Sequence, residues 1–247
     1  MREVLLDLIR HTGGLGFLDT VKVFGTADKT EIESMDNDRT VILKATLKTP
    51  VPDLVGEFGM TRFNILQGFL GFANYRTDSS SIRIKTKERA GGKTVPEELV
   101  FSDGQGQSST YRFMSADLIP EQAKFLGTSW DVEVEPSRSK ILEFIQMSSI
   151  LNSIEHYFLV KTVDNSLRFY IGDEQAATDR ACVIIEPDLK TGTLSGELYW
   201  DSVPIAPILK LGLDENVKLH FSNRGALQIS MSSSLADYKF ICPAKRK

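Results

Sequence analysis

The sequence predicts an α+β protein made of two similar domains, and three observations carry this prediction. The chain has 247 residues, which is enough for two medium domains at about 100–200 residues each. Helical periodicity occurs in few places, and it occurs in the same order in both halves. The rest is rich in strand-like segments, with Gly, Asn and Asp in the gaps. Each half is therefore expected to run helix, strands, helix, strands.

Each half opens with an amphipathic helix. In the first half, apolar residues recur at helical spacing from Val4 to Ile9, and Gly13 ends the run as glycine commonly does. In the second half, Pro136 and Ser137 begin a helix whose apolar stripe includes Phe144. A second helix is expected midway through each half, over residues 61–73 and 202–211.

Short β-rich segments fill the remainder of each half. The expected strands are 20–24, 40–47, 81–87 and 111–113 in the first half, and 157–163, 167–171, 182–185, 217–221, 226–231 and 238–241 in the second. The polar stretch 102–109 lies between two strand-like runs, and no helix follows it to supply an N-terminus for phosphate binding. It is therefore predicted to be a hairpin connection.

A connector is expected between the halves. Residues 115–128 mix Pro120, Gly127 and charges, and they fit neither helical nor strand periodicity. The predicted division is an N-terminal domain over 1–114, this connector, and a C-terminal domain over 129–247.

Composition is that of a soluble globular protein. The chain carries 29 Lys and Arg against 33 Asp and Glu, a net charge of −4, and 41% of its residues are hydrophobic. The N-terminus has no apolar signal core, and no run approaches the ~18–20 apolar residues that a membrane span needs. Its two cysteines, Cys182 and Cys242, form no CxxC pair, which fits a reducing compartment. A cytoplasmic protein without membrane contact is expected.

No motif supports an enzyme. The three histidines are dispersed, and the chain has no HExxH, GxGxxG, GxSxG or Walker-type string. No two Cys or His residues lie at metal-ligand spacing. A hydrolase that uses His156 and Asp164 would have no spacing argument behind it. We therefore expect no catalytic residues, no metal and no cofactor.

Three short strings resemble those of the sliding DNA clamps. Ser34-Met35-Asp36, with the apolar strand that follows it, resembles a string of proliferating cell nuclear antigen (PCNA) and its relatives. The closing Phe240-Ile241-Cys242-Pro243 resembles their aromatic-aliphatic-small-Pro ending. The run FNILQGFLGF over residues 63–72 is similar to the second helix of phage clamps, and the second half is also phage-like in element order. The two-domain layout matches as well.

This resemblance implies a fold and a function. It implies two clamp-type domains, each with antiparallel sheets outside and two helices on the inner side, assembled into a ring that is a homotrimer at this length. It implies that the ring encircles double-stranded DNA, is opened by a clamp loader and tethers the replicative DNA polymerase as a processivity factor. If the protein is viral, it implies the host cell cytoplasm.

The charge pattern agrees with such a ring. Residues 1–12, 62–76, 136–153 and 202–212 carry a net charge of +4, which leaves −8 on the rest of the chain. Basic helices suit sequence-independent phosphate contact. The residues expected to contact DNA are Arg2, Arg10, Arg62, Arg76, Arg138, Lys140 and Lys210. Against this, Glu3 and Asp7 are expected to share a polar face with Arg10 and His11, which would bring negative charge near the duplex.

The resemblance also implies an apolar pocket that accepts a short motif from polymerases and other clients. The matching positions are Met35, Leu118, Ile119, Phe240, Cys242 and Pro243. The basic tail 244–247 is expected to be solvated. The alternative to a clamp is a structural or assembly β-rich protein such as a virion subunit, which would have no need of two sets of basic helices.

Overall fold

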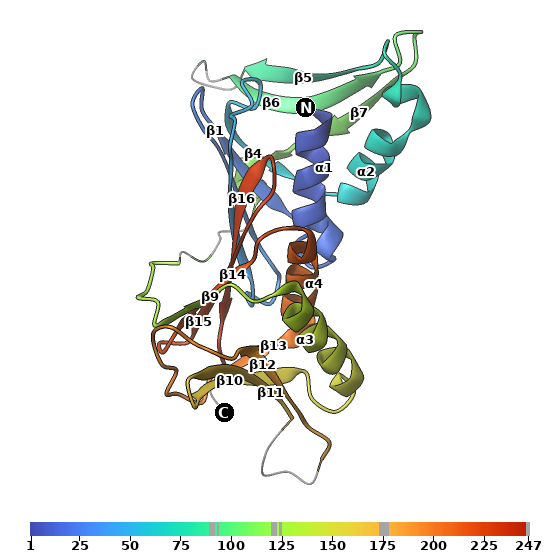
Figure 1. The fold of residues 1–247 in the computed structure, drawn as a ribbon. Helices are drawn as coiled ribbons and strands as arrows, with labels where there is room; N and C mark the ends of the chain where they lie inside the picture. The colour runs from blue at the N-terminus through green and yellow to red at the C-terminus, as the bar shows by residue number, and fades with distance from the viewer. Residues whose placement is uncertain (89–91, 93, 120–122, 124, 173–177, 246–247) are drawn as a thin grey trace. The chain divides into compact units, whose positions relative to one another are not determined.

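The computed structural model describes the whole chain except residues 89–91, 93, 120–122, 124, 173–177 and 246–247, so Pro120 and the last two residues of the basic tail lie outside the described part. The chain folds into two compact units (Figure 1). Unit 1 comprises Met1–Arg39, Leu43–Ala123 and Ser233–Tyr238, and unit 2 comprises Thr40–Ile42, Lys124–Ser232 and Lys239–Lys247. The boundaries expected from the sequence stay a prediction.

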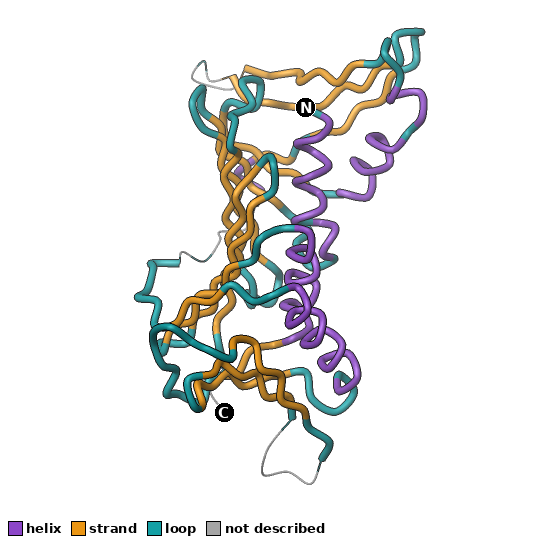
Figure 2. The backbone as a smooth tube through the Cα atoms, viewed as in Figure 1, coloured by secondary structure: helices purple, strands orange, loops and turns teal. Residues whose placement is uncertain are grey.

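In the described part of each unit there are two α-helices, in the order expected from the sequence. Their bounds are α1 Arg2–His11, α2 Phe63–Gly71, α3 Arg138–Leu151 and α4 Ser202–Leu211. Short 3-10 helices are η1 Gly13–Leu15, η2 Ala73–Arg76, η3 Ala116–Leu118 and η4 Gly212–Asp214. Helices α1 and α2 contact each other within unit 1, as do α3 and α4 within unit 2 (Figure 2). Among the described residues, no helix is long and apolar enough to cross a membrane.

The strands of unit 1 form two antiparallel groups. They are β1 Val21–Gly25, β2 Thr30–Met35, β3 Ile42–Leu47, β4 Gly56–Met60, β5 Ser81–Glu88, β6 Thr94–Ser102, β7 Ser108–Arg112 and β8 Met114–Ser115. The first group has the order β8-β4-β1-β2-β3 and the second has the order β5-β6-β7.

Unit 2 repeats this arrangement. Its strands are β9 Val132–Val134, β10 Tyr157–Val163, β11 Ser166–Ile171, β12 Ala181–Glu186, β13 Tyr199–Asp201, β14 Lys218–Ser222, β15 Ala226–Ser232 and β16 Ala236–Pro243. One group has the order β12-β11-β10-β13 and the other has the order β16-β15-β14-β9. The first three residues of β16 belong to unit 1, and Ile42, the first residue of β3, belongs to unit 2. The predicted α+β class with antiparallel sheets is confirmed.

Several strands were not predicted, because their sequences lack the alternation of apolar and polar residues that is typical of a strand. On β2 the buried side is Thr30, Ile32 and Ser34, so two of its three inward residues are polar. Strand β6 contains Pro96, which is tolerated because the pairing with β5 shifts register opposite it. Strands β4, β8, β9 and β13 were also missed. The predicted hairpin at 102–109 is confirmed, with Ser102 paired to Ser108.

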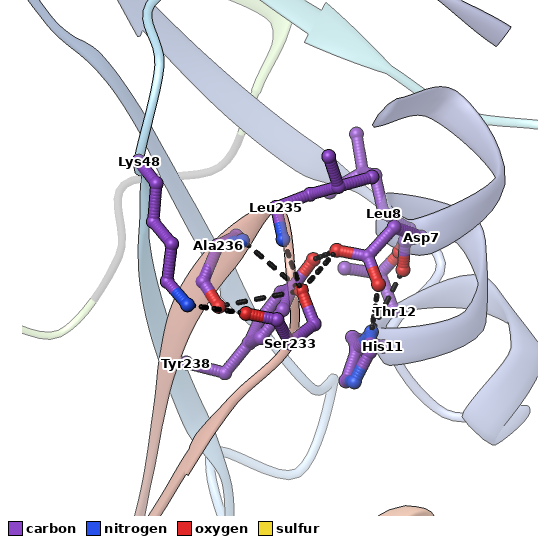
Figure 3. Close-up of polar contacts among 9 residues, drawn as sticks. All are labelled: Asp7, Leu8, His11, Thr12, Lys48, Ser233, Leu235, Ala236 and Tyr238. Atoms are coloured by element: carbon purple, nitrogen blue, oxygen red, sulfur yellow. Dashed lines mark hydrogen bonds and ion pairs between the residues drawn. The ribbon is translucent and has the colours of Figure 1, made fainter. Parts of the chain in front are cut away.

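A mostly buried carboxylate, that of Asp7, joins α1 to the segment Ser233–Tyr238 in unit 1 (Figure 3). Asp7 Oδ2 on α1 accepts hydrogen bonds from Tyr238 Oη at 2.7 Å and from Ser233 Oγ at 2.9 Å. The His11 ring is fully buried and stacks on Tyr238 with ring centroids 3.9 Å apart. The Lys48 ammonium group donates a hydrogen bond to the Ser233 carbonyl. One helical side chain therefore holds the segment Ser233–Tyr238 in unit 1.

Unit 2 has an aromatic core in the corresponding place. Phe144 of α3 meets Phe158 and Phe169 edge-on, with ring centroids at 4.8 and 5.2 Å. Trp200 and Phe221 extend the cluster, with centroids 5.5 Å apart. Edge-to-face pairs of this kind add about 0.5–1.5 kcal/mol each beyond the area that they bury.

Candidate nucleic-acid interface

Helix α1 presents a neutral exposed stripe. Glu3, Leu6 and Arg10 are exposed, whereas Asp7 and His11 point into unit 1. The expectation that Asp7 and His11 share the exposed face is wrong, because Tyr238 and Ser233 satisfy the Asp7 carboxylate inside the unit. Glu3 is therefore the one carboxylate of α1 on that face.

The basic side chains near α2 differ in whether they already have hydrogen-bond partners within the protein. Arg2 donates to the carbonyls of Leu70 and Tyr75, where α2 ends and η2 follows. Arg62 donates to the Arg112 carbonyl at 3.0 Å, and its guanidinium lies 5.9 Å from the centre of the Tyr111 ring. Arg76 is exposed and makes no hydrogen bond or ion pair with the described residues.

Tyr111 holds the chain where α2 begins. Its hydroxyl donates to the Thr61 carbonyl at 2.5 Å and accepts from the Thr61 amide at 3.1 Å. Burial raises the pKa of Tyr111 to about 12. The next residue, Arg62, has a left-handed backbone with φ of 54°. This clasp orients the first turn of α2 and places Arg62 at its start.

The cations of unit 2 lie on α3 and α4. Arg138 donates to the Leu213 carbonyl and lies 3.6 Å from Asp214. Lys140 pairs with Glu143 at 2.7 Å, one helical turn away. The Lys210 side chain is exposed and makes no hydrogen bond or ion pair with the described residues. Two of these three cations therefore share their charge with a neighbouring carboxylate.

The helices carry less positive charge than the sequence segments suggested. Within the observed helix bounds the net charge is +2, because Arg62 and Arg76 lie outside α2. Exposed apolar side chains stand among the cations: Leu6, Ile65, Leu142, Met147, Ile150 and Val203. A surface of this kind attracts phosphates weakly and has few hydrogen-bond donors for base edges.

The six residues of the predicted client pocket differ in exposure. Leu118 is 70% exposed, whereas Ile119 is buried against Gly59, where an added Cβ would lie 2.7 Å from its Cδ1 atom. Met35 accepts a weak hydrogen bond from the Ala123 amide at 3.5 Å. In unit 2, Phe240 and Cys242 are buried and Pro243 is exposed. The pocket as a whole stays a prediction, and Leu118 is its most accessible residue.

One set of functional candidates was missed from the sequence. Strand β5 exposes Arg83, Lys85 and Lys87 at alternating positions, all on one face. The alternation with Ile82 and Ile84 was the available signal. Among the described residues, no group of three or more His, Cys, Asp or Glu side chains is arranged to hold a metal ion.

Comparison by sequence finds no relative: no family model matches the chain, and no curated protein is similar to it. Comparison by structure finds PCNA proteins. The chain is similar to *A. fulgidus* PCNA bound to the C-terminal region of FEN-1, with a TM-score of 0.71, 7% identity, and coverage of 100% of this chain and 97% of that one.

Two further structures agree. PCNA from *Thermococcus kodakaraensis* has a TM-score of 0.66 and 11% identity, and covers 99% of this chain and 97% of its own. PCNA from *Entamoeba histolytica* has a TM-score of 0.63 and 12% identity, with coverage of 99% and 94%. The chain therefore has the fold of the PCNA sliding clamps, as the resemblance of its short strings implied. A closer relation to phage clamps stays a prediction.

Proposed function

We propose that the protein is one subunit of a ring-shaped sliding clamp that encircles duplex DNA and tethers a replicative DNA polymerase. The observation that carries this proposal is the match of the entire chain to the PCNA fold, at a TM-score of 0.71. The internal repeat supports it, because a clamp of this length builds its ring from two similar domains per subunit. In this role the protein is a scaffold without catalysis of its own.

Free strand edges support assembly into a ring. Among the described residues, β7 pairs only with β6, and β12 pairs only with β11. Helix α2 contacts β7, and helix α3 contacts β12. Exposed apolar residues accompany both edges: Ile65 and Phe72 for β7, and Ile150 and Ile184 for β12.

Pairing β7 of one copy with β12 of the next joins two different surfaces. Repeated contacts of this head-to-tail kind close into a ring when the rotation allows it. We expect three copies, which gives six domains around the hole. A clamp loader would open one of these contacts, and the cytoplasm is the proposed location.

The modest charge of the helices suits sliding. Arg10, Arg76 and Lys210 are exposed on or beside helices of both units, and in a clamp they would meet phosphates without reading bases. The ion pairs of Arg138 and Lys140 lower the field that these two residues add. Weak, sequence-independent attraction keeps a duplex inside a ring and lets it move.

Client binding is proposed at the connector. FEN-1 is bound to the *A. fulgidus* protein through its C-terminal region. By likeness, a short polymerase segment would contact the exposed Leu118 and its predicted neighbours. Burying one or two apolar anchors, at about 1.5–3 kcal/mol each, gives the exchangeable affinity that a shared ring needs.

The proposal is tested by measuring mass in solution and retention on DNA. We expect a trimer that, once loaded, stays on a closed circular duplex and slides off when the circle is cut. The double variant Arg76→Ala/Lys210→Ala should shorten retention equally for all sequences and reduce the salt slope by about 1 per lost phosphate contact. Lys29→Ala, which removes a turn cation paired with Glu31, is the matched control.

Two results would overturn the clamp. A monomer at all concentrations would favour a structural or virion subunit. Equal retention on closed and cut circles would show that DNA is bound at a surface and not encircled.

A further inference from the structure

The two halves of the chain correspond element by element, with two exceptions: β9, and β8, whose place beside β4 is taken beside β13 by a single bridge between Tyr199 and Lys245. Helix α1 corresponds to α3, the strands β1–β4 correspond to β10–β13, helix α2 corresponds to α4, and β5–β7 correspond to β14–β16. Strand β9 precedes α3 and pairs with the outer edge of β14. Strand β5 is the counterpart of β14, but no described strand pairs with its outer edge.

Strand β9 shows which side chains suit a strand that pairs with the outer edge of β14. It runs antiparallel to β14, and its side chains alternate between buried and exposed. Val132 and Val134 are buried in unit 2. On the outer side, Glu135 pairs with Lys218 at 2.9 Å, and Glu133 lies 3.5 Å from His220. Apolar residues therefore cover the sheet, while acidic residues meet the basic side chains of β14.

Strand β5 has the same alternation but lacks the cover. Ile82 and Ile84 are only partly buried, whereas Leu219 and Phe221 on β14 are at most 2% exposed. On the other side stand Arg83, Lys85 and Lys87. Lys85 and Lys87 lie 3.0 and 3.8 Å from Glu98 and Glu97 of β6 but remain 64% and 65% exposed. The Arg83 side chain makes no hydrogen bond or ion pair with the described residues.

We propose that the outer edge of β5 is a docking site for an extended acidic segment of a partner protein, which adds a strand to the β5-β6-β7 sheet. Main-chain hydrogen bonds would give the affinity, and alternate side chains would give the specificity. The segment has the pattern of β9, with aliphatic residues that cover Ile82 and Ile84 and carboxylates that meet Arg83 and Lys85. The site is separate from the β7 edge, and it does not depend on ring assembly.

The charges argue for a partner and against a second copy of the same edge. Two β5 strands paired antiparallel would place their cations opposite one another, and like charges in such positions are destabilising. Exposed lysines and a register shift also protect edge strands from aggregation, and β5 has both. If these features of β5 only prevent aggregation, the edge should have no preference for an acidic strand. An experiment can therefore distinguish prevention of aggregation from docking of a partner.

The probe is a synthetic peptide with the sequence of residues 129–136, which contains β9. Amide hydrogen exchange is measured on the full-length protein with and without the peptide. We expect slower exchange at residues 81–88, and binding that weakens as salt is added. A peptide with Glu133→Lys and Glu135→Lys is the charge control and should bind about tenfold more weakly or not at all.

Variants of the protein complete the test. Arg83→Glu replaces an exposed side chain that has no hydrogen-bond or ion-pair partner among the described residues, and it should weaken peptide binding about tenfold with an unchanged circular dichroism spectrum. Lys29→Glu reverses an exposed cation of the same unit away from β5 and should leave binding unchanged. The proposal is overturned if residues 81–88 are not protected, if both peptides bind equally, or if protection appears at β14 through exchange with β9.

Discussion

Helices α1 and α3 hold the same place in the two halves of the chain, but different chemistry attaches each to its strands. In unit 1, the Asp7 carboxylate of α1 accepts from Tyr238 and Ser233 (Figure 3). In unit 2, Phe144 of α3 packs edge-on against Phe158 and Phe169. The attachment of α1 adds directed polar bonds to the buried Leu5, Leu8 and Ile9, whereas the contacts of Phe144 are apolar.

The difference teaches that this fold requires a buried contact under the helix but not a particular kind. Apolar packing scales with area, and it is lost in proportion to the atoms removed. A mostly buried carboxylate with two donors depends on a few directed bonds, and its removal takes away the acceptor of those donors. Substitutions in the two units are therefore expected to lower the free energy of unfolding by different amounts. A second substitution is expected to restore part of the loss only in unit 1, where it can remove a donor left without its acceptor.

The largest effect is expected in unit 2. Phe144→Ala removes a fully buried ring from the centre of the aromatic cluster and should lower the free energy of unfolding by about 3–5 kcal/mol. Urea unfolding followed by the fluorescence of Trp200 and Trp130 measures the change. Leu126→Ala, at a side chain 94% exposed, is the control and should have almost no effect. A loss under 1 kcal/mol would show that α3 is held elsewhere.

An intermediate effect is expected in unit 1. Asp7→Ala removes the acceptor of the Tyr238 hydroxyl and leaves the Ser233 hydroxyl only the more distant Ala236 carbonyl at 3.4 Å, and it should cost about 1–3 kcal/mol. Asp7→Asn keeps one acceptor oxygen and should cost less. Removing Tyr238 Oη as well, in Asp7→Ala/Tyr238→Phe, should restore part of the loss, because the orphaned donor is gone. Strict additivity in urea unfolding would contradict a shared bond.

The smallest effect concerns pH and a polar group of unit 2, His220. Burial lowers the pKa of His220, although Glu133 at 3.5 Å acts in the opposite direction. Lys218 and Lys239 lower the pKa further. The unfolded chain therefore takes up this proton at a higher pH than the fold does, so stability falls as pH drops below about 6.5.

The measurement for His220 is the urea midpoint between pH 7.5 and 5. The wild type should lose more stability across this range than His220→Gln, which cannot be protonated. Equal slopes for the two proteins would mean that His220 is protonated as readily in the fold as in the unfolded chain.

The sequence alone determined the repeat, the four helices and most strands of the second half. Local periodicity suffices for these elements: α4 and β10 have the predicted bounds, and the apolar residues of β15 alternate strictly. The short strings around Met35 and Phe240 pointed to the clamp fold, and comparison of the structures confirmed it.

Only the tertiary structure decided which side of each element is covered. Asp7, Tyr75 and Ile119 have polar or connector contexts in the sequence, yet their side chains are drawn into unit 1 by residues far along the chain. The open edge of β5 could not be predicted from the sequence of β5 either, because an edge is open only when no other strand pairs with it, and none of the described strands does. Periodicity records a residue's neighbours along the chain, whereas burial and strand pairing depend on contacts between residues distant in sequence.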